Sequence, residues 1–147
     1  MAALLSSAIA TPALAQMDAE EQIETRQGAF TFAAWNMGKI KAQAVDGEVA
    51  YNQGQMMAAA NAIAAVGNSG LGALFGPGTS MDDFENTRLL PVFFDRPDRA
   101  REVAIAFAKE SAKLQEVAAT GDKAALAAQF SEVGKSCKAC HDDFRDE

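Results

Sequence analysis

The chain has 147 residues, of which 49% are apolar and 22% are charged, and this composition is typical of one globular domain rather than of a disordered or multidomain protein. Its 20 acidic residues outnumber 13 basic ones, and the net charge of −7 disfavours nucleic acid and anionic membrane surfaces as partners. The two cysteines are too few for the disulfide framework of a small secreted protein, so they need another explanation.

Residues 1–15 indicate an export signal. They form an uncharged run of apolar and small residues that ends in Ala13-Leu14-Ala15, a motif that signal peptidases accept. No Lys or Arg precedes the run, and it is shorter than the roughly 20 apolar residues of a membrane span, so an anchor and a disordered tail are weaker alternatives. We therefore expect cleavage before Gln16, a domain of residues 16–147, and a periplasmic location if the source is bacterial.

Two helices are predicted in the first half of the chain. The first covers residues 18–46, where the apolar residues Ile23, Phe30, Met37 and Ala44 repeat every seven positions. The second covers residues 52–66, and an extension to residue 75 is left open because three glycines weaken that stretch. Residues 76–97 contain three prolines and no clean period, which predicts a long connection packed against the rest of the protein.

Two more helices complete the chain. The third runs from residue 97 or 98 to residue 120 and ends at Gly121. The fourth starts near Asp122, and its inward positions step by four and three through Leu126, Phe130, Val133, Cys137, Cys140 and Phe144. No stretch alternates with period two for long enough to be a strand. The sequence therefore predicts an all-α protein, an antiparallel four-helix bundle with one longer crossover.

Cys137, Cys140 and His141 form the C-x-x-C-H pattern of covalent haem attachment. Positions three apart lie on one helical face, so both thiols can add to the vinyl groups of one porphyrin, and the next residue offers an imidazole to the iron. We expect haem c to be held in the bundle interior, with His141 as its axial ligand. A thiol redox pair, a zinc site and two plain core cysteines are weaker alternatives, because the pair lies near a helix C-terminus and the chain has one histidine.

The single histidine excludes ligation by two histidines of one chain. The sixth iron position is then vacant or is taken by a methionine, for which Met37 is the best placed by pattern. Phe30, one heptad earlier, offers a ring that can cover the iron without binding it.

The chain resembles the cytochromes c′ over nearly all of residues 16–147. The resemblance is carried by Thr25-Arg26-Gln27 followed by Phe30, by Trp35-Asn36-Met37-Gly38-Lys39, by Phe75-Gly76-Pro77-Gly78-Thr79, and above all by the C-terminal position of Cys137-Lys138-Ala139-Cys140-His141. It implies a five-coordinate, high-spin haem c with an apolar distal pocket that admits NO and CO.

The same resemblance implies roles for individual residues. Phe30 takes the distal position, where its ring restricts access more tightly than an aliphatic side chain. Arg26 and Gln27 hold the haem propionates, with Thr87 as a third contact, and Arg145 lies near the proximal haem face. The family also implies a homodimer, for which the exposed faces of the first two helices are the expected contact.

Two functions follow from these observations. The first, which the resemblance implies, is binding of diatomic gases, NO above all, on a five-coordinate iron. The alternative is electron transfer through a six-coordinate iron, and the sequence does not identify a redox partner. A peroxidase needs a distal acid–base group, and the only histidine is already used, so we do not expect an enzyme.

Overall fold

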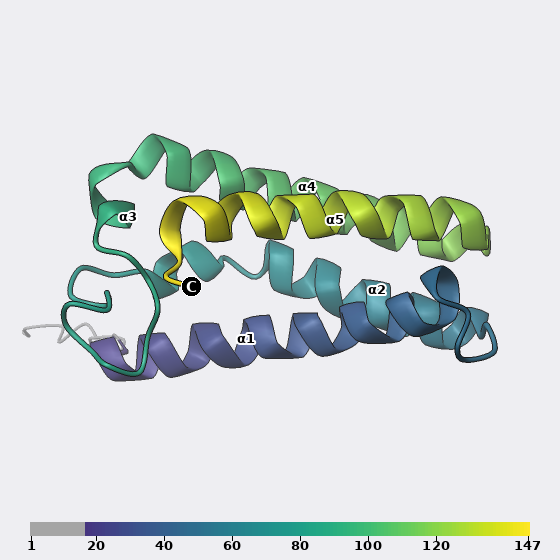
Figure 1. Cartoon of the computed structure of the whole chain (residues 1–147), viewed down its shortest axis with the longest axis horizontal. Coiled ribbons are helices and arrows are strands. Elements are labelled where there is room, and N and C mark those ends of the chain that lie inside the picture. The colour runs from purple at the N-terminus through teal and green to yellow at the C-terminus, as the bar shows by residue number, and fades with distance from the viewer. Residues whose placement is uncertain (1–16) are drawn as a thin grey trace, which may run out of the picture.

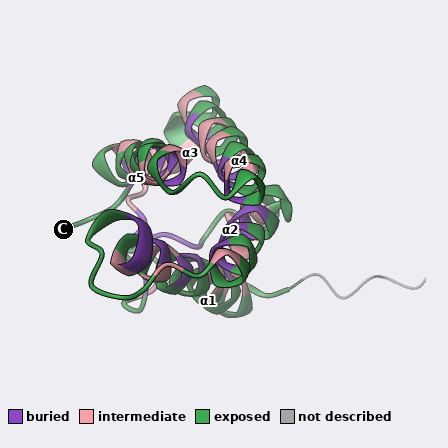
Figure 2. Cartoon of the chain, turned by 90° about the vertical axis from the view of Figure 1, so that its right-hand side faces the viewer, coloured by how far each residue is buried: buried purple, intermediate pink, exposed green. Residues whose placement is uncertain are grey.

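Four long helices make up most of residues 17–147, the part of the chain that the computed structural model describes. They are α1 (Ala19–Ile40), α2 (Gln53–Asn68), α4 (Pro97–Thr120) and α5 (Lys123–Phe144). Each runs opposite to the one before it, and the order around the bundle is α1, α2, α4, α5 (Figures 1 and 2). The predicted antiparallel four-helix bundle is confirmed. The export signal predicted at residues 1–15 lies outside the described residues.

Polar side chains set the helix starts at the positions that the sequence predicts. Asp18 and Glu21 form a reciprocal capping box at the start of α1, and the Asn52 side chain accepts a hydrogen bond from the backbone N–H of Gln55 at the start of α2. Asp122 caps α5 in the same way. Gly121, with φ of 77°, ends α4 in a left-handed conformation that other residues rarely adopt.

The end of the first helix differs from the prediction of one regular helix to residue 46. After Ile40 the chain forms a π-helical turn, η1 (Lys41–Val45). This wider turn brings the side chain of Gln43 inside, where its Nε2 donates to Oε1 of Gln55 at 2.6 Å and its Oε1 accepts from the backbone N–H of Asn52 at 2.9 Å. The corner between α1 and α2 is therefore closed by a buried amide network.

The crossover from α2 to α4 has more structure than the sequence predicts. The second helix does not extend to residue 75, because Gly70 turns left-handed with φ of 78° and a short 3-10 helix, η2 (Leu71–Leu74), follows. One further helical turn, α3 (Val92–Asp95), interrupts the stretch predicted as plain connection. The crossover wraps one end of the bundle beside the C-terminus (Figure 1).

Buried side chains form two separate cores along the bundle, and buried turns of the helices face its centre (Figure 2). We call the larger one the main core; its buried members are Ile40, Ala44, Met56, Ala59, Ala60, Ile63, Leu114, Ala118, Leu126 and Val133. The second, the end core, lies under the crossover and consists of Leu89, Ala100, Val103 and Phe144. Along residues 17–147, no helix combines the length and the apolarity that crossing a bilayer requires.

Candidate haem site

The C-x-x-C-H motif occupies the last turns of α5, where the two cores meet. Cys137 is half-buried and packs against the main core, whereas Cys140 is half-buried and packs against the end core. Both thiols therefore lie on the inner face of α5, as the 4-3 spacing predicts. The motif marks the junction between the two cores on this helix.

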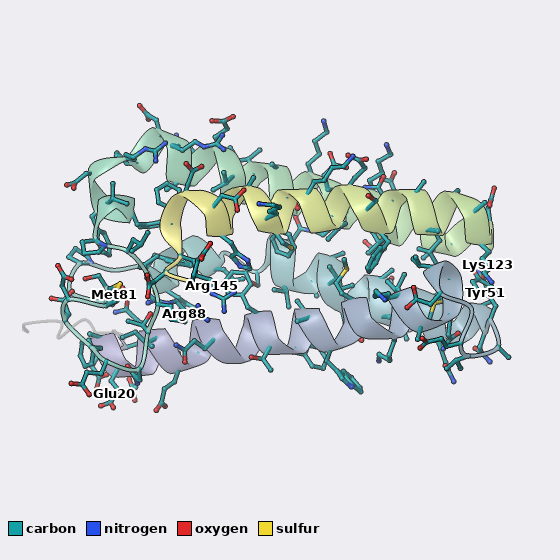
Figure 3. The ribbon with its side chains drawn as sticks, viewed as in Figure 1. Glu20, Tyr51, Met81, Arg88, Lys123 and Arg145 are labelled. Atoms are coloured by element: carbon teal, nitrogen blue, oxygen red, sulfur yellow. The ribbon has the colours of Figure 1, made fainter. Side chains whose placement is uncertain are left out.

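His141 lies at the edge of that face rather than in its middle. It is exposed, and with Arg88 and Arg145 it lines a pocket of about 310 Å³. One residue along a helix turns by about 100°, so the residue after Cys140 cannot share its direction. The expectation that His141 points along the same face as the cysteines is therefore met only in part. Figure 3 shows Arg88 and Arg145 beside the end of α5.

The surroundings of these groups set their protonation. Burial raises the pKa of the Cys137 thiol, and burial together with negative charge at Cys137 and Asp143 raises the pKa of Cys140. A thiol redox pair needs the opposite shift. Burial lowers the pKa of His141, and the charges of Arg145 and Arg88 lower it further against the opposing effect of Asp142. This downward shift favours the neutral imidazole, the form that binds a metal.

Phe30 marks the same junction of the two cores on α1. Its ring centroid lies 6.5 Å from that of Phe75, which packs against the end core, and 6.4 Å from that of Phe107, which packs against the main core. The heptad repeat of α1 predicts a buried stripe that includes Phe30, but 40% of the Phe30 surface stays exposed. The buried face of α1 instead passes through Ile23 and Ala33. An apolar ring from α1 and two thiols from α5 thus border the same region of the bundle.

Arg26 is the most deeply buried cation of the site, with 3% of its surface exposed. Its Nη1 donates to Oγ1 of Thr79 at 2.8 Å and to the carbonyl of Leu74 at 3.1 Å. Its Nη2 donates to the carbonyl of Thr79 at 2.6 Å and to Oγ1 of Thr87 at 2.9 Å. All four partners are neutral, and burial lowers the pKa of the guanidinium. A buried positive charge without a carboxylate favours an anion nearby.

The other residues proposed from the resemblance fall into two groups. Thr87 is buried beside Arg26, and Gln27, which is exposed, donates from Nε2 to the carbonyl of Asn86 at 2.6 Å. Arg145 instead lines the pocket of His141. The structure therefore brings Arg26, Gln27 and Thr87 to one segment of the crossover.

Sequence reasoning missed three residues that build this region. Thr79 accepts from Arg26 twice, through its hydroxyl and its carbonyl. Phe75 lies under the guanidinium, with the Arg26 Cζ 4.8 Å from the ring centroid. Arg88 is exposed and lines the pocket of His141. The Pro77-Gly78 turn is a sequence signal for Thr79, because such a turn fixes the position of the residue that follows it.

The residues present fit a haem. Two thiols on one helical face, a neutral imidazole beside them, aromatic walls on α1 and α4, and a buried cation suited to a carboxylate are the groups that such a cofactor needs. The C-x-x-C-H motif in the last helix of such a bundle places the chain in the class of c-type cytochromes.

The comparisons with known proteins specify the family. A family model described as Cytochrome C' matches residues 21–145. The cytochrome c′ of Allochromatium vinosum is 48% identical over 143 residues, which are 97% of this chain and 88% of that protein. The chain belongs to the cytochrome c′ family, which binds haem c.

Solved structures agree with this assignment. A cytochrome c′ described as having ligand-controlled dimer dissociation has a TM-score of 0.82 and 46% identity, and the match covers 90% of this chain and 100% of that one. A variant of the cytochrome c′ from Alcaligenes xylosoxidans in complex with nitric oxide has a TM-score of 0.77 and 30% identity, and the match covers 88% and 98% of the two chains.

Proposed function

We propose that this chain is a periplasmic haem c protein whose five-coordinate iron binds NO and CO. The observation that carries the proposal is the position of Cys137, Cys140 and His141 at the junction of the two cores, with Phe30 bordering the same region from α1. When bound there, haem c supplies an iron with one open position for a diatomic gas. The protein supplies attachment, an axial imidazole and an apolar cover.

Thioether bonds from Cys137 and Cys140 would fix the cofactor, and His141 would bind the iron from the side of the exposed pocket. The lowered pKa of His141 supports this role, because a neutral imidazole has a free lone pair for the metal. Arg145 lines the same pocket and would lie near the proximal face of the haem.

The distal side is assigned to Phe30. A ring held against Phe75 and Phe107 would restrict access to a haem bound beside it and would offer no hydrogen bond to a ligand. Small uncharged gases are the ligands that such a cover admits. It also lacks an acid–base group for cleaving an O–O bond, so we propose gas binding without enzymatic turnover.

The propionates are assigned to Arg26, Gln27 and Thr87, which the crossover holds together. Because the terminal nitrogens of Arg26 already have four protein acceptors, its contribution to a propionate would be mainly that of a nearby positive charge. Gln27 is exposed, so its side-chain amide can rotate toward a propionate and donate a hydrogen bond to it.

We also propose a homodimer that forms through α1 and α2. Large apolar side chains are exposed there: Phe32 (50%), Trp35 (60%) and Met57 (38%). Phe32 and Trp35 pack together with ring centroids 5.9 Å apart. A relative with ligand-controlled dimer dissociation supports a dimer in this family.

Titration of the reduced protein with CO and then NO, under anaerobic conditions and followed by absorption, tests the function. Gas binding predicts a broad spectrum that sharpens with each gas at stoichiometric amounts. The alternative, electron transfer through a six-coordinate iron with Met37 as ligand, predicts little response to CO. Met37 is half-buried and packs against the main core, which favours the first function.

A further inference from the structure

Residues 87–90 of the crossover, which we call the strap, are fastened to α1. Oγ1 of Thr87 accepts a hydrogen bond from Nη2 of Arg26 at 2.9 Å and another from the backbone N–H of Leu89 at 3.3 Å. Thr87 is 6% exposed and Arg26 is 3% exposed, so water does not compete strongly for these bonds. Arg26 therefore fixes the conformation of the strap from the side of α1.

The strap is also bonded to residues 144–146, three to five positions after His141. The backbone N–H of Leu90 donates to the carbonyl of Phe144 at 2.9 Å, and that of Asp146 donates to the carbonyl of Arg88 at 2.9 Å. Leu89 and Arg145 form an antiparallel β-bridge between these two bonds. The end of α5 is thus paired with the strap like a short two-stranded ribbon.

The last link reaches the backbone of His141. The backbone N–H of Arg145 donates to the carbonyl of His141 at 3.0 Å, the last helical bond of α5. A continuous path of hydrogen bonds therefore runs from Arg26 through Thr87, the strap and Arg145 to the backbone of His141. Figure 1 shows the crossover lying between the start of α1 and the end of α5.

From this path we infer that Arg26 is a positioning residue for the axial ligand, acting on His141 through Thr87 and the strap. The inference rests on the proposed role of His141 and goes beyond it, because Arg26 is otherwise assigned only to the propionates. Without the strap, the final turn of α5 would be a helix end free to fray, and the imidazole on it would move with that turn.

The link also joins the two faces of the site. Phe30 lies four residues after Arg26 on α1, which places it one turn further along the same helix. A shift of α1 at Phe30 would therefore reach the strap through Arg26. The positions of Phe30 on the distal side and of His141 on the proximal side are therefore coupled through the buried guanidinium of Arg26.

The test uses three variants of the holoprotein. T87V keeps the shape of the side chain but removes the hydroxyl, T87S restores a hydroxyl, and T31V makes the same change at an exposed position of α1. The readouts are the iron–histidine stretching band of the reduced protein in resonance Raman spectra and its affinity for CO. We expect T87V to shift or broaden the band and to change the affinity about threefold to tenfold, T87S to recover most of that change, and only T31V to resemble wild type.

A fourth variant checks that the effect of T87V is not caused by misfolding. Truncation after Arg145 removes the bond from Asp146 to Arg88 at an exposed end of the chain and leaves the cores intact. The truncated protein should show a shift of the iron–histidine band in the same direction as T87V. A lower melting temperature of T87V with an unchanged band in both variants would overturn the inference and leave Arg26 a purely structural residue. A wild-type protein without an iron–histidine band would instead overturn the proposed function.

Discussion

Phe30 on α1 and Phe107 on α4 lie with ring centroids 6.4 Å apart, and Phe30 still keeps 40% of its surface exposed. A ring that is supported on one side and open on the other is suited to cover something placed between the helices. If that cover limits access to the iron, the size of residue 30 sets the rate at which a gas enters.

We therefore expect F30A to accelerate CO association by at least about tenfold, because the ring that obstructs the iron is lost. F30L should lie between F30A and wild type. Stopped-flow mixing of the reduced protein with CO measures this rate. F32A removes an exposed ring two residues away and serves as the control. Equal rates in F30A and F32A would remove Phe30 from the distal position.

Covalent haem attachment should survive the loss of either cysteine but not the loss of both. In a host that matures c-type cytochromes, C137A and C140A should each retain one covalent bond to the haem, whereas the double variant should release its haem into acidified organic solvent. Haem staining of denaturing gels measures the attachment. Haem retained by the double variant on such a gel would contradict attachment through these thiols.

The contact between α2 and α4 has little room at Gly67. A Cβ atom there would lie 2.3 Å from Oγ of Ser111 and 3.3 Å from Cα of Ala108. G67A should therefore destabilise the fold by about 1–3 kcal/mol and lower the melting temperature by several degrees.

The double variant G67A/S111A tests the cause of that loss. Removing Oγ of Ser111 eliminates the closest contact, so the second substitution should recover part of the stability that G67A loses. Thermal unfolding followed by circular dichroism, with S111A alone as the control, gives the coupling between the two sites. Strict additivity would mean that the clash is not the cause.

The dimer should depend on the exposed aromatic face of α1. Trp35 and Ile105 are both 60% exposed, but Trp35 lies on α1 and Ile105 lies on α4. We expect W35E to yield a monomer, because a carboxylate would be buried in the contact, and I105E to leave the dimer intact. Light scattering coupled to size-exclusion chromatography measures the mass of each. A monomeric I105E with a dimeric W35E would move the interface to the other side of the bundle.

Much of the fold could be predicted because the signals for its helix boundaries and helix faces lie within a few neighbouring residues. The caps at Asp18, Asn52 and Asp122 and the left-handed Gly121 identify helix boundaries through bonds within a few residues. The 4-3 spacing of the last helix likewise identified the inner face that carries Cys137 and Cys140. Such signals do not require knowledge of any distant residue.

The unpredicted features depend on contacts between distant parts of the chain. The π-turn after Ile40 is stabilised by Gln43 and Gln55, and neither residue alone signals it. The resemblance implies a role for Arg26 at the propionates, but its binding to Thr79 and Thr87 joins residues more than fifty positions apart. Phe30 follows the heptad of α1 yet stays exposed, because burial at that position depends on what packs across the bundle.

The absorption spectrum of the reduced holoprotein, recorded without oxygen and before any gas is added, tests the central claim most directly. A vacant sixth position on an iron held by His141 predicts one broad visible band of the high-spin type. Sharp, well-separated α and β bands would show a second protein ligand on the iron and would contradict the account.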